Sequence, residues 1–125
     1  MGNLVECIGT SFSTPRVVKK FASILDEMND KDLLLAKALL IHSAKINTGA
    51  IQNKDDIKYY GFGMPHNDVN DILRCNEHEI TLVFKQKISN GSHLELMDFP
   101  FPESLIKDGK YYGEIFMTLV YNPPL

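Results

Sequence analysis

The chain has 125 residues, of which 44% are hydrophobic and 23% charged, a composition typical of a globular protein and not of a disordered one. The formal net charge is -3, and the 13 basic and 16 acidic residues are interspersed, so no basic patch indicates a nucleic-acid partner or an anionic membrane surface. No apolar run approaches the roughly 20 residues that cross a bilayer, so no membrane partner is expected. The two cysteines, Cys7 and Cys75, are expected to be small core residues in a reducing compartment, because they are too few for a disulfide framework.

The first predicted element is a short strand over residues 4–8, where an apolar and partly β-branched run ends at Gly9. Thr14 and Pro15 then mark the entrance of a helix, because a hydroxyl can cap backbone N–H groups and proline is well tolerated at the first helical position. Apolar side chains recur with a helical period as far as Met28. This first helix should therefore be half-buried.

A second helix is predicted over the apolar run 33–41, with Asn29 or Asp30 as its cap and Asp32 in its first turn. The run is apolar nearly all the way round, so we expect this helix to be covered on several sides.

Two further elements follow a polar loop over residues 47–56. The stretch 59–63, YYGFG, predicts a glycine-rich turn, and a short helix over 69–73 should start at a cap provided by Asn67 or Asp68.

The C-terminal part of the chain is predicted to be β-rich, because apolar and polar residues alternate there. Residues 80–84 and 93–97 should form the two arms of a hairpin around the turn signal SNGS at 89–92. Residues 107–110 predict another turn, and 114–121 a last strand. We therefore expect an α+β fold, with helices followed by a small antiparallel β region.

The candidate for chemistry is Ser11, which follows Gly9 and Thr10 immediately before the first helix. There, unpaired backbone N–H groups and the positive end of the helix dipole would stabilise an oxyanion beside the attacking hydroxyl. A serine hydroxyl is a weak nucleophile near neutral pH and needs a base, usually a histidine oriented by a carboxylate. Nothing in the chain order brings a histidine to Ser11; the four are His42, His66, His78 and His93.

Metal and cofactor sites are not predicted. The spacing of Cys75 and His78 would suit half of a zinc site, but such sites need about four ligands and no second pair is evident.

The string GTSFSTPRV, residues 9–17, resembles the serine motif of the subtilisin-like serine proteases, the subtilases, which reads GTSxSxP or GTSxAxP and is followed by a helix. The fixed residues would arise by chance in a chain of this length with a probability on the order of 10⁻⁴. Residues 57–73, IKYYGFGMPHNDVNDIL, are similar to the YGxG turn and final helix of the subtilase catalytic domain, and the 33–41 helix lies between the two motifs as in the family. The resemblance covers residues 4–75.

The resemblance implies that Ser11 is the nucleophile, that its backbone N–H is one oxyanion donor, and that Gly9 and Thr10 form the turn that presents it. Pro15 matches the helix start. In subtilases the catalytic Asp and His and the oxyanion Asn precede the serine, so all three would lie before Met1. The chain differs from the family at two positions of the motif: Phe12 stands where methionine is common, and Arg16 stands where the family often has histidine.

As a whole, the resemblance implies that residues 1–76 are the C-terminal part of a subtilase catalytic domain, with two long helices and a short one from its α/β fold. Residues 77–125 would begin the β-rich extension of some large bacterial subtilases, and the bacterial cytoplasm is favoured as the compartment. The parent protein would be a serine endopeptidase acting on polypeptide substrates, without a cofactor, and this chain alone would be inactive. Apolar helix faces without their sheet would make the chain self-associate.

Two alternatives to a protease fragment stay open. In the first, residues 77–125 are a β-rich binding or docking module. In the second, the whole chain belongs to a non-catalytic subtilase relative that keeps the serine motif for folding.

Overall fold

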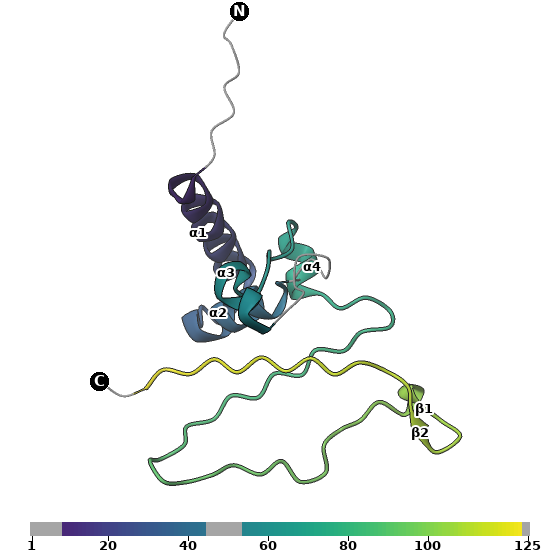
Figure 1. The fold of residues 1–125 in the computed structure, drawn as a ribbon. Coiled ribbons are helices and arrows are strands. Elements are labelled where there is room, and N and C mark those ends of the chain that lie inside the picture. Colours follow the sequence, from purple (N-terminus) through teal and green to yellow (C-terminus); the bar gives the residue numbers. More distant parts are fainter. Residues whose placement is uncertain (1–8, 45–53, 124–125) are drawn as a thin grey trace, which may run out of the picture. The chain divides into compact units, whose positions relative to one another are not determined.

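The computed structural model describes residues 9–44 and 54–123 (Figure 1). Within these ranges the protein is α+β, with several helices and a small two-stranded antiparallel sheet, which confirms the coarse fold class. The strand predicted over residues 4–8 and most of the predicted loop over 47–56 lie outside the described residues.

Contacts between residues divide the chain into two units. The helical unit comprises residues 1–79 and 118–125, and the extended unit comprises residues 80–117. The division into a protease part, 1–76, and an extension, 77–125, stays a prediction.

The longest helix, α1, spans Thr10–Glu27. It begins before Thr14 and Pro15, so the helix start predicted at these two residues is wrong. Thr14 does not cap the helix, because its Oγ1 donates a hydrogen bond to the carbonyl of Thr10 at 3.0 Å. A threonine can make such a bond to the preceding turn inside a helix, so a hydroxyl beside a proline did not mark the boundary.

Helix α1 packs with α2 (Leu33–His42) and α4 (Val69–Leu73) around a small core at its C-terminal half (Figure 1). The N-terminal half of α1 is less covered, since Val17 and Val18 are 42% and 59% exposed. The half-buried helix expected from the sequence is therefore found only in part. The buried side chains of the core are Ile24, Ala36, Leu40 and Ile72.

Asp32 starts helix α2. Its Oδ1 accepts hydrogen bonds from the N–H groups of Leu34 and Leu35 at 2.9 and 3.1 Å. The predicted caps Asn29 and Asp30 are wrong, because a cap must stand directly before the first turn with extended backbone, as Asp32 does.

Helix α2 is less enclosed than its sequence predicts. Ala36 and Leu40 are its buried residues, whereas Leu33 is 64% exposed. The sequence predicts that other parts of the protein cover this helix on several sides. Among the described residues, at least the side that carries Leu33 is not covered.

The glycine-rich turn and the cap of α4 agree with the sequence. Gly61 and Gly63 have positive φ angles of 58° and 92°, a region that glycine enters without steric cost. Asp68 caps α4 by accepting the N–H of Asn70 at 2.9 Å, which confirms one of the two predicted caps. The remaining short elements of the helical unit are η1 (Lys54–Asp56) and α3 (Ile57–Tyr60).

In the extended unit, β1 (Ile106–Lys107) follows the short helix η2 (Glu103–Leu105) and pairs with β2 (Lys110–Tyr111) in antiparallel register. Asp108 and Gly109 join the strands with positive φ angles of 53° and 70°. A two-residue hairpin turn of this kind favours Asp-Gly, because both residues must be left-handed. The turn predicted over 107–110 is confirmed.

The other predicted strands are not formed in the described residues. Residues 80–84, 93–97 and 114–121 have no regular pairing, although Ser92 N–H donates to the carbonyl of Ser89 at 3.0 Å and closes the predicted turn (Figure 1). Alternating apolar residues form a strand only where a surface covers them, and an isolated hairpin is at best marginally stable in water.

Ring contacts connect distant parts of the extended unit. Phe99 lies 6.2 Å from Phe84 and 4.7 Å from Phe101, measured between ring centroids, and Phe101 lies 5.7 Å from Tyr111. These four aromatic side chains therefore link the hairpin of β1 and β2 to the irregular segments before it.

The cap of α2 gives a direct test of the corrected helix start. We expect Asp32→Ala to lower the free energy of unfolding by about 1 kcal/mol, because two N–H groups lose their acceptor. Urea unfolding followed by circular dichroism measures the change. The matched control is Asp30→Ala, which should be neutral; an equal loss in both variants would contradict the assignment.

Exposed apolar side chains on the helices predict self-association of the 125-residue chain. Val18 and Leu33 are 59% and 64% exposed, and their replacement by aspartate should shift the population toward monomer. Sedimentation velocity over a range of protein concentrations measures this. A chain that stays monomeric at all concentrations and binds no apolar dye is the opposite result.

Candidate catalytic serine and its surroundings

Ser11 is exposed and lies in the first turn of α1, directly after the first helical residue, Thr10. The first N–H groups of a helix have no intrahelical acceptor, and the dipole is positive there. Gly9 is the N-cap and provides no side-chain hydrogen bond. The N–H of Phe12 donates to the carbonyl of Gly9 at 3.0 Å, whereas that of Ser11 has no acceptor among the described residues. The helix end thus presents an N–H donor beside the Ser11 hydroxyl.

The neighbouring hydroxyls are bound to the helix backbone. Ser13 Oγ lies 3.3 Å from the carbonyl oxygens of both Gly9 and Thr10, and Thr14 Oγ1 donates to that of Thr10. Ser11 Oγ makes no hydrogen bond within the part of the chain that the structure describes. Of these three side chains, Ser11 is therefore the one whose hydroxyl is available to a ligand.

Pro15 removes a hydrogen bond at the carbonyl of Ser11. In a regular helix this carbonyl accepts the N–H of the residue four positions on, which here is Pro15, inside α1. Proline has no N–H, and its ring crowds the same carbonyl. The first turn of α1 is therefore held less firmly around Ser11 than the rest of the helix.

Gly9 is not required by the local geometry. Its φ of 169° and ψ of 155° are extended values that any residue adopts. A Cβ on Gly9 would lie 3.8 Å from the ring of Phe12, an ordinary contact. Within the described residues, then, neither backbone nor packing explains a glycine at this position.

A base for Ser11 is missing from the described residues. None of the four histidines contacts Ser11 there, and His78 is exposed. Without a base the hydroxyl of Ser11 is a weak nucleophile. The other three histidines have other partners: His42 Nδ1 lies 2.9 Å from Thr118 Oγ1, His66 Nδ1 3.9 Å from Asp71 Oδ2, and His93 Nε2 3.5 Å from Glu95 Oε1.

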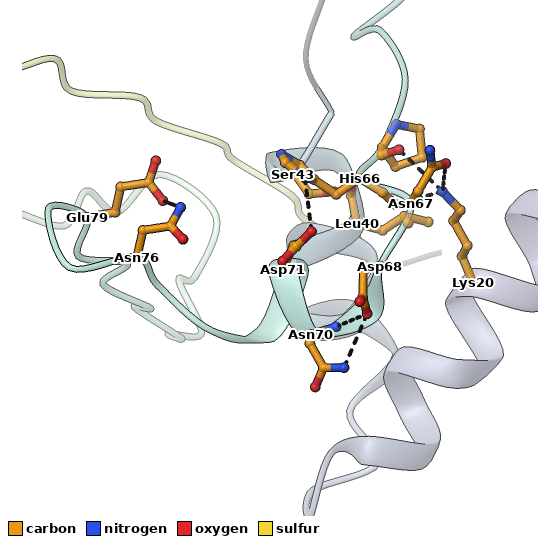
Figure 2. Close-up of polar contacts among 11 residues, drawn as sticks. Lys20, Leu40, Ser43, His66, Asn67, Asp68, Asn70, Asp71, Asn76 and Glu79 are labelled. Atoms are coloured by element: carbon orange, nitrogen blue, oxygen red, sulfur yellow. Dashed lines mark hydrogen bonds and ion pairs between the residues drawn. The ribbon is translucent and has the colours of Figure 1, made fainter.

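Lys20 of α1 forms hydrogen bonds with the turn before α4, as Figure 2 shows. Its half-buried Nζ donates to the carbonyls of Pro65 and His66 at 3.3 and 2.6 Å and to Asn67 Oδ1 at 3.1 Å. Hydrogen bonds from a charged donor contribute roughly 1.5–3 kcal/mol each when well made. The sequence pattern places Lys20 on the polar face of its helix but cannot reveal this role, since the acceptors lie 45 to 47 residues further along the chain.

A groove of about 920 Å³ lies beside this contact, between α1 and the segment 64–69. Its α1 wall includes Arg16, Lys19 and Lys20 but not Ser11. At about 100° per residue, Lys20 stands half a turn away from Ser11 around the helix. The groove and the serine are therefore separate features.

The described residues contain no group of three His, Cys, Asp or Glu side chains arranged to hold a metal ion. Cys75 is exposed, so its expected place in the core is wrong, while Cys7 lies outside the described ranges. In the same ranges no helix has both the length and the apolar character that a membrane span requires.

The structure thus brings the predicted site residues Gly9, Thr10 and Ser11 together at one helix end, without a base. Comparisons with protein-family models, with curated proteins and with solved structures found no match for this chain. A functional proposal therefore rests on the residues and their geometry.

The effect of Pro15 on the first turns of α1 is testable. We expect Pro15→Ala to raise the free energy of unfolding by up to about 3 kcal/mol, because alanine supplies the N–H that the Ser11 carbonyl lacks and relieves the ring contact. Urea unfolding measures the gain, with Val18→Ala as an exposed control on the same helix. An unchanged or lower stability of Pro15→Ala would show that the proline costs the helix nothing.

Proposed function

We propose that the chain is part of a subtilisin-like serine endopeptidase and that Ser11 is the nucleophile. The observation that carries the proposal is the position of the GTSFSTP string: it places Ser11, exposed, in the first turn of an 18-residue helix whose end no side chain caps among the described residues. The substrate would be a polypeptide.

In this proposal, Ser11 Oγ attacks the carbonyl carbon of the scissile peptide bond and its proton passes to a base. The tetrahedral oxyanion accepts a hydrogen bond from the N–H of Ser11. One such donor typically stabilises the transition state by about 2.7–4 kcal/mol. Collapse expels the amine, which takes up the proton, and leaves the acyl group on Ser11. Water then hydrolyses this ester and restores the hydroxyl.

The remaining catalytic groups would come from outside the described residues. Subtilases use a histidine as the base, an aspartate that orients it and an asparagine as the second oxyanion donor, all of which precede the serine in the family. The described histidines support a base from outside the described residues, since three of them contact side chains other than Ser11. The 125-residue chain alone should therefore be inactive.

The exposed apolar sides of the helices support the finer fold proposal, a fragment of the subtilisin-like α/β fold. Helices that pack on a sheet carry an apolar stripe toward it, and Val18 and Leu33 are both more than half exposed, at 59% and 64%. In the parent protein such side chains would be covered by the sheet.

A second candidate function is a binding or docking module formed by residues 77–125. It is favoured by large apolar side chains that the extended unit leaves open: Ile80, Phe116 and Met117 are 63%, 74% and 90% exposed. A non-catalytic relative of the subtilases, in which the serine motif serves folding alone, would keep the geometry of Ser11 but not its reactivity.

Labelling with a serine-directed fluorophosphonate tests the role of Ser11. In the longer gene product we expect labelling that is abolished by Ser11→Ala and kept by Ser13→Ala, the matched control two residues away on the same helix. The isolated 125-residue chain should label at most at background, because loss of the base removes several orders of magnitude in rate.

The other outcomes separate the candidates. Labelling that survives Ser11→Ala would reject Ser11 as the nucleophile, and an unlabelled longer protein would favour the non-catalytic relative. Peptidase activity that needs Ser11 but persists after removal of residues 77–125 would show that the second candidate is not the source of the activity.

A further inference from the structure

The groove beside Lys20 carries positive charge that the described residues do not neutralise. Arg16 and Lys19 line it, are exposed, and make no hydrogen bond or ion pair within the described part of the chain. They stand three residues apart on α1, so their side chains are neighbours on the helix surface. Together they form a two-cation edge of the groove.

The other charges of the groove are already engaged. Lys20 Nζ bonds to two carbonyls and an amide oxygen, none of which is a carboxylate, so its charge remains. Asp68 is the carboxylate in the lining, and it accepts from Asn70 N–H at 2.9 Å and from Asn70 Nδ2 at 3.2 Å as the cap of α4. The lining therefore has three cations against one carboxylate that is bound to the helix end.

An apolar surface adjoins these cations. Val17 and Met64 line the groove and are 42% and 77% exposed, with Pro65 and Val69 beside them. The volume of about 920 Å³ is near the upper end of the roughly 300–1,000 Å³ typical of ligand pockets. A lone inorganic anion would fill little of it and would leave the apolar wall unused.

We propose that this groove binds an acidic, extended peptide segment of a partner protein. Carboxylates of the segment pair with Arg16 and Lys19, and an apolar side chain between them packs on Val17 and Met64. A guanidinium can hold a carboxylate through two parallel hydrogen bonds, which gives the pairing a fixed geometry. Charge complementarity decides the sign of the partner, and the apolar wall favours a peptide over a nucleic acid.

The probe is a fluorescein-labelled peptide of alternating Glu and Leu, titrated with the 125-residue chain and followed by fluorescence anisotropy. We expect it to bind at least about tenfold more tightly than the peptide with Gln in place of Glu, with an affinity that falls as salt is added. Lys19→Glu should weaken binding by about tenfold, and combination with Arg16→Glu should weaken it further.

The matched control is Lys87→Glu, which makes the same change of charge at an exposed lysine of the extended unit and should leave the affinity within about twofold. Circular dichroism verifies that each variant is folded. Equal weakening by Lys19→Glu and Lys87→Glu, equal affinity for the Glu and Gln peptides, or displacement of the peptide by an oligonucleotide at lower concentration would each overturn the proposal. Ser11→Ala should not change the affinity, so this test is independent of the proposed protease function.

Discussion

The packing of α1 against α2 and α4 around Ile24 is the contact on which the helical unit depends. Ile24 is fully buried, and burial of one such side chain contributes roughly 1.5–3 kcal/mol. The rest of the core is small, so polar contacts at its edge carry much of the specificity: Asp32 fixes where α2 begins, and Lys20 fixes the segment before α4. Ser11 lies outside this packed region, at the opposite end of α1, where the helix itself positions it.

If the proposed function holds, Ser11 and its helix end supply one half of a catalytic site. The helix end offers a positive dipole and an N–H donor, and these act on the oxyanion as it forms. They do nothing to remove the proton from the hydroxyl, which needs a base within hydrogen-bond distance. Under the proposed function, the base would have to come from a part of the protein outside the described residues. The cationic groove adds a binding surface on another side of the same helix.

Local signals could be predicted from the sequence, and contacts between distant segments could not. The Asp108-Gly109 turn and the Asp68 cap each depend on two or three adjacent residues, and both are found. The start of α1 could not be predicted correctly because the hydroxyl of Thr14 has two possible partners: a carbonyl of the preceding turn, to which it donates, or an N–H of the following turn, from which it would accept. The strands expected over 80–84, 93–97 and 114–121 need neighbours that alternation alone does not supply. The contacts of Lys20 could not be predicted, because its acceptors lie 45 to 47 residues further along the chain. For the candidate site, the motif indicated the serine and a helix close to it, whereas the position of Ser11 inside the first turn of α1 and the groove could not be predicted.

The hydrogen bond between His42 and Thr118 joins residues 76 positions apart, and both residues belong to the helical unit. Residues 80–117 are thus an insertion in the helical unit, because the residues before and after this segment both belong to that unit. The entropy of closing such an insert changes only slowly with its length. A change in the length of this segment would therefore leave the order in which the helices are connected unaltered.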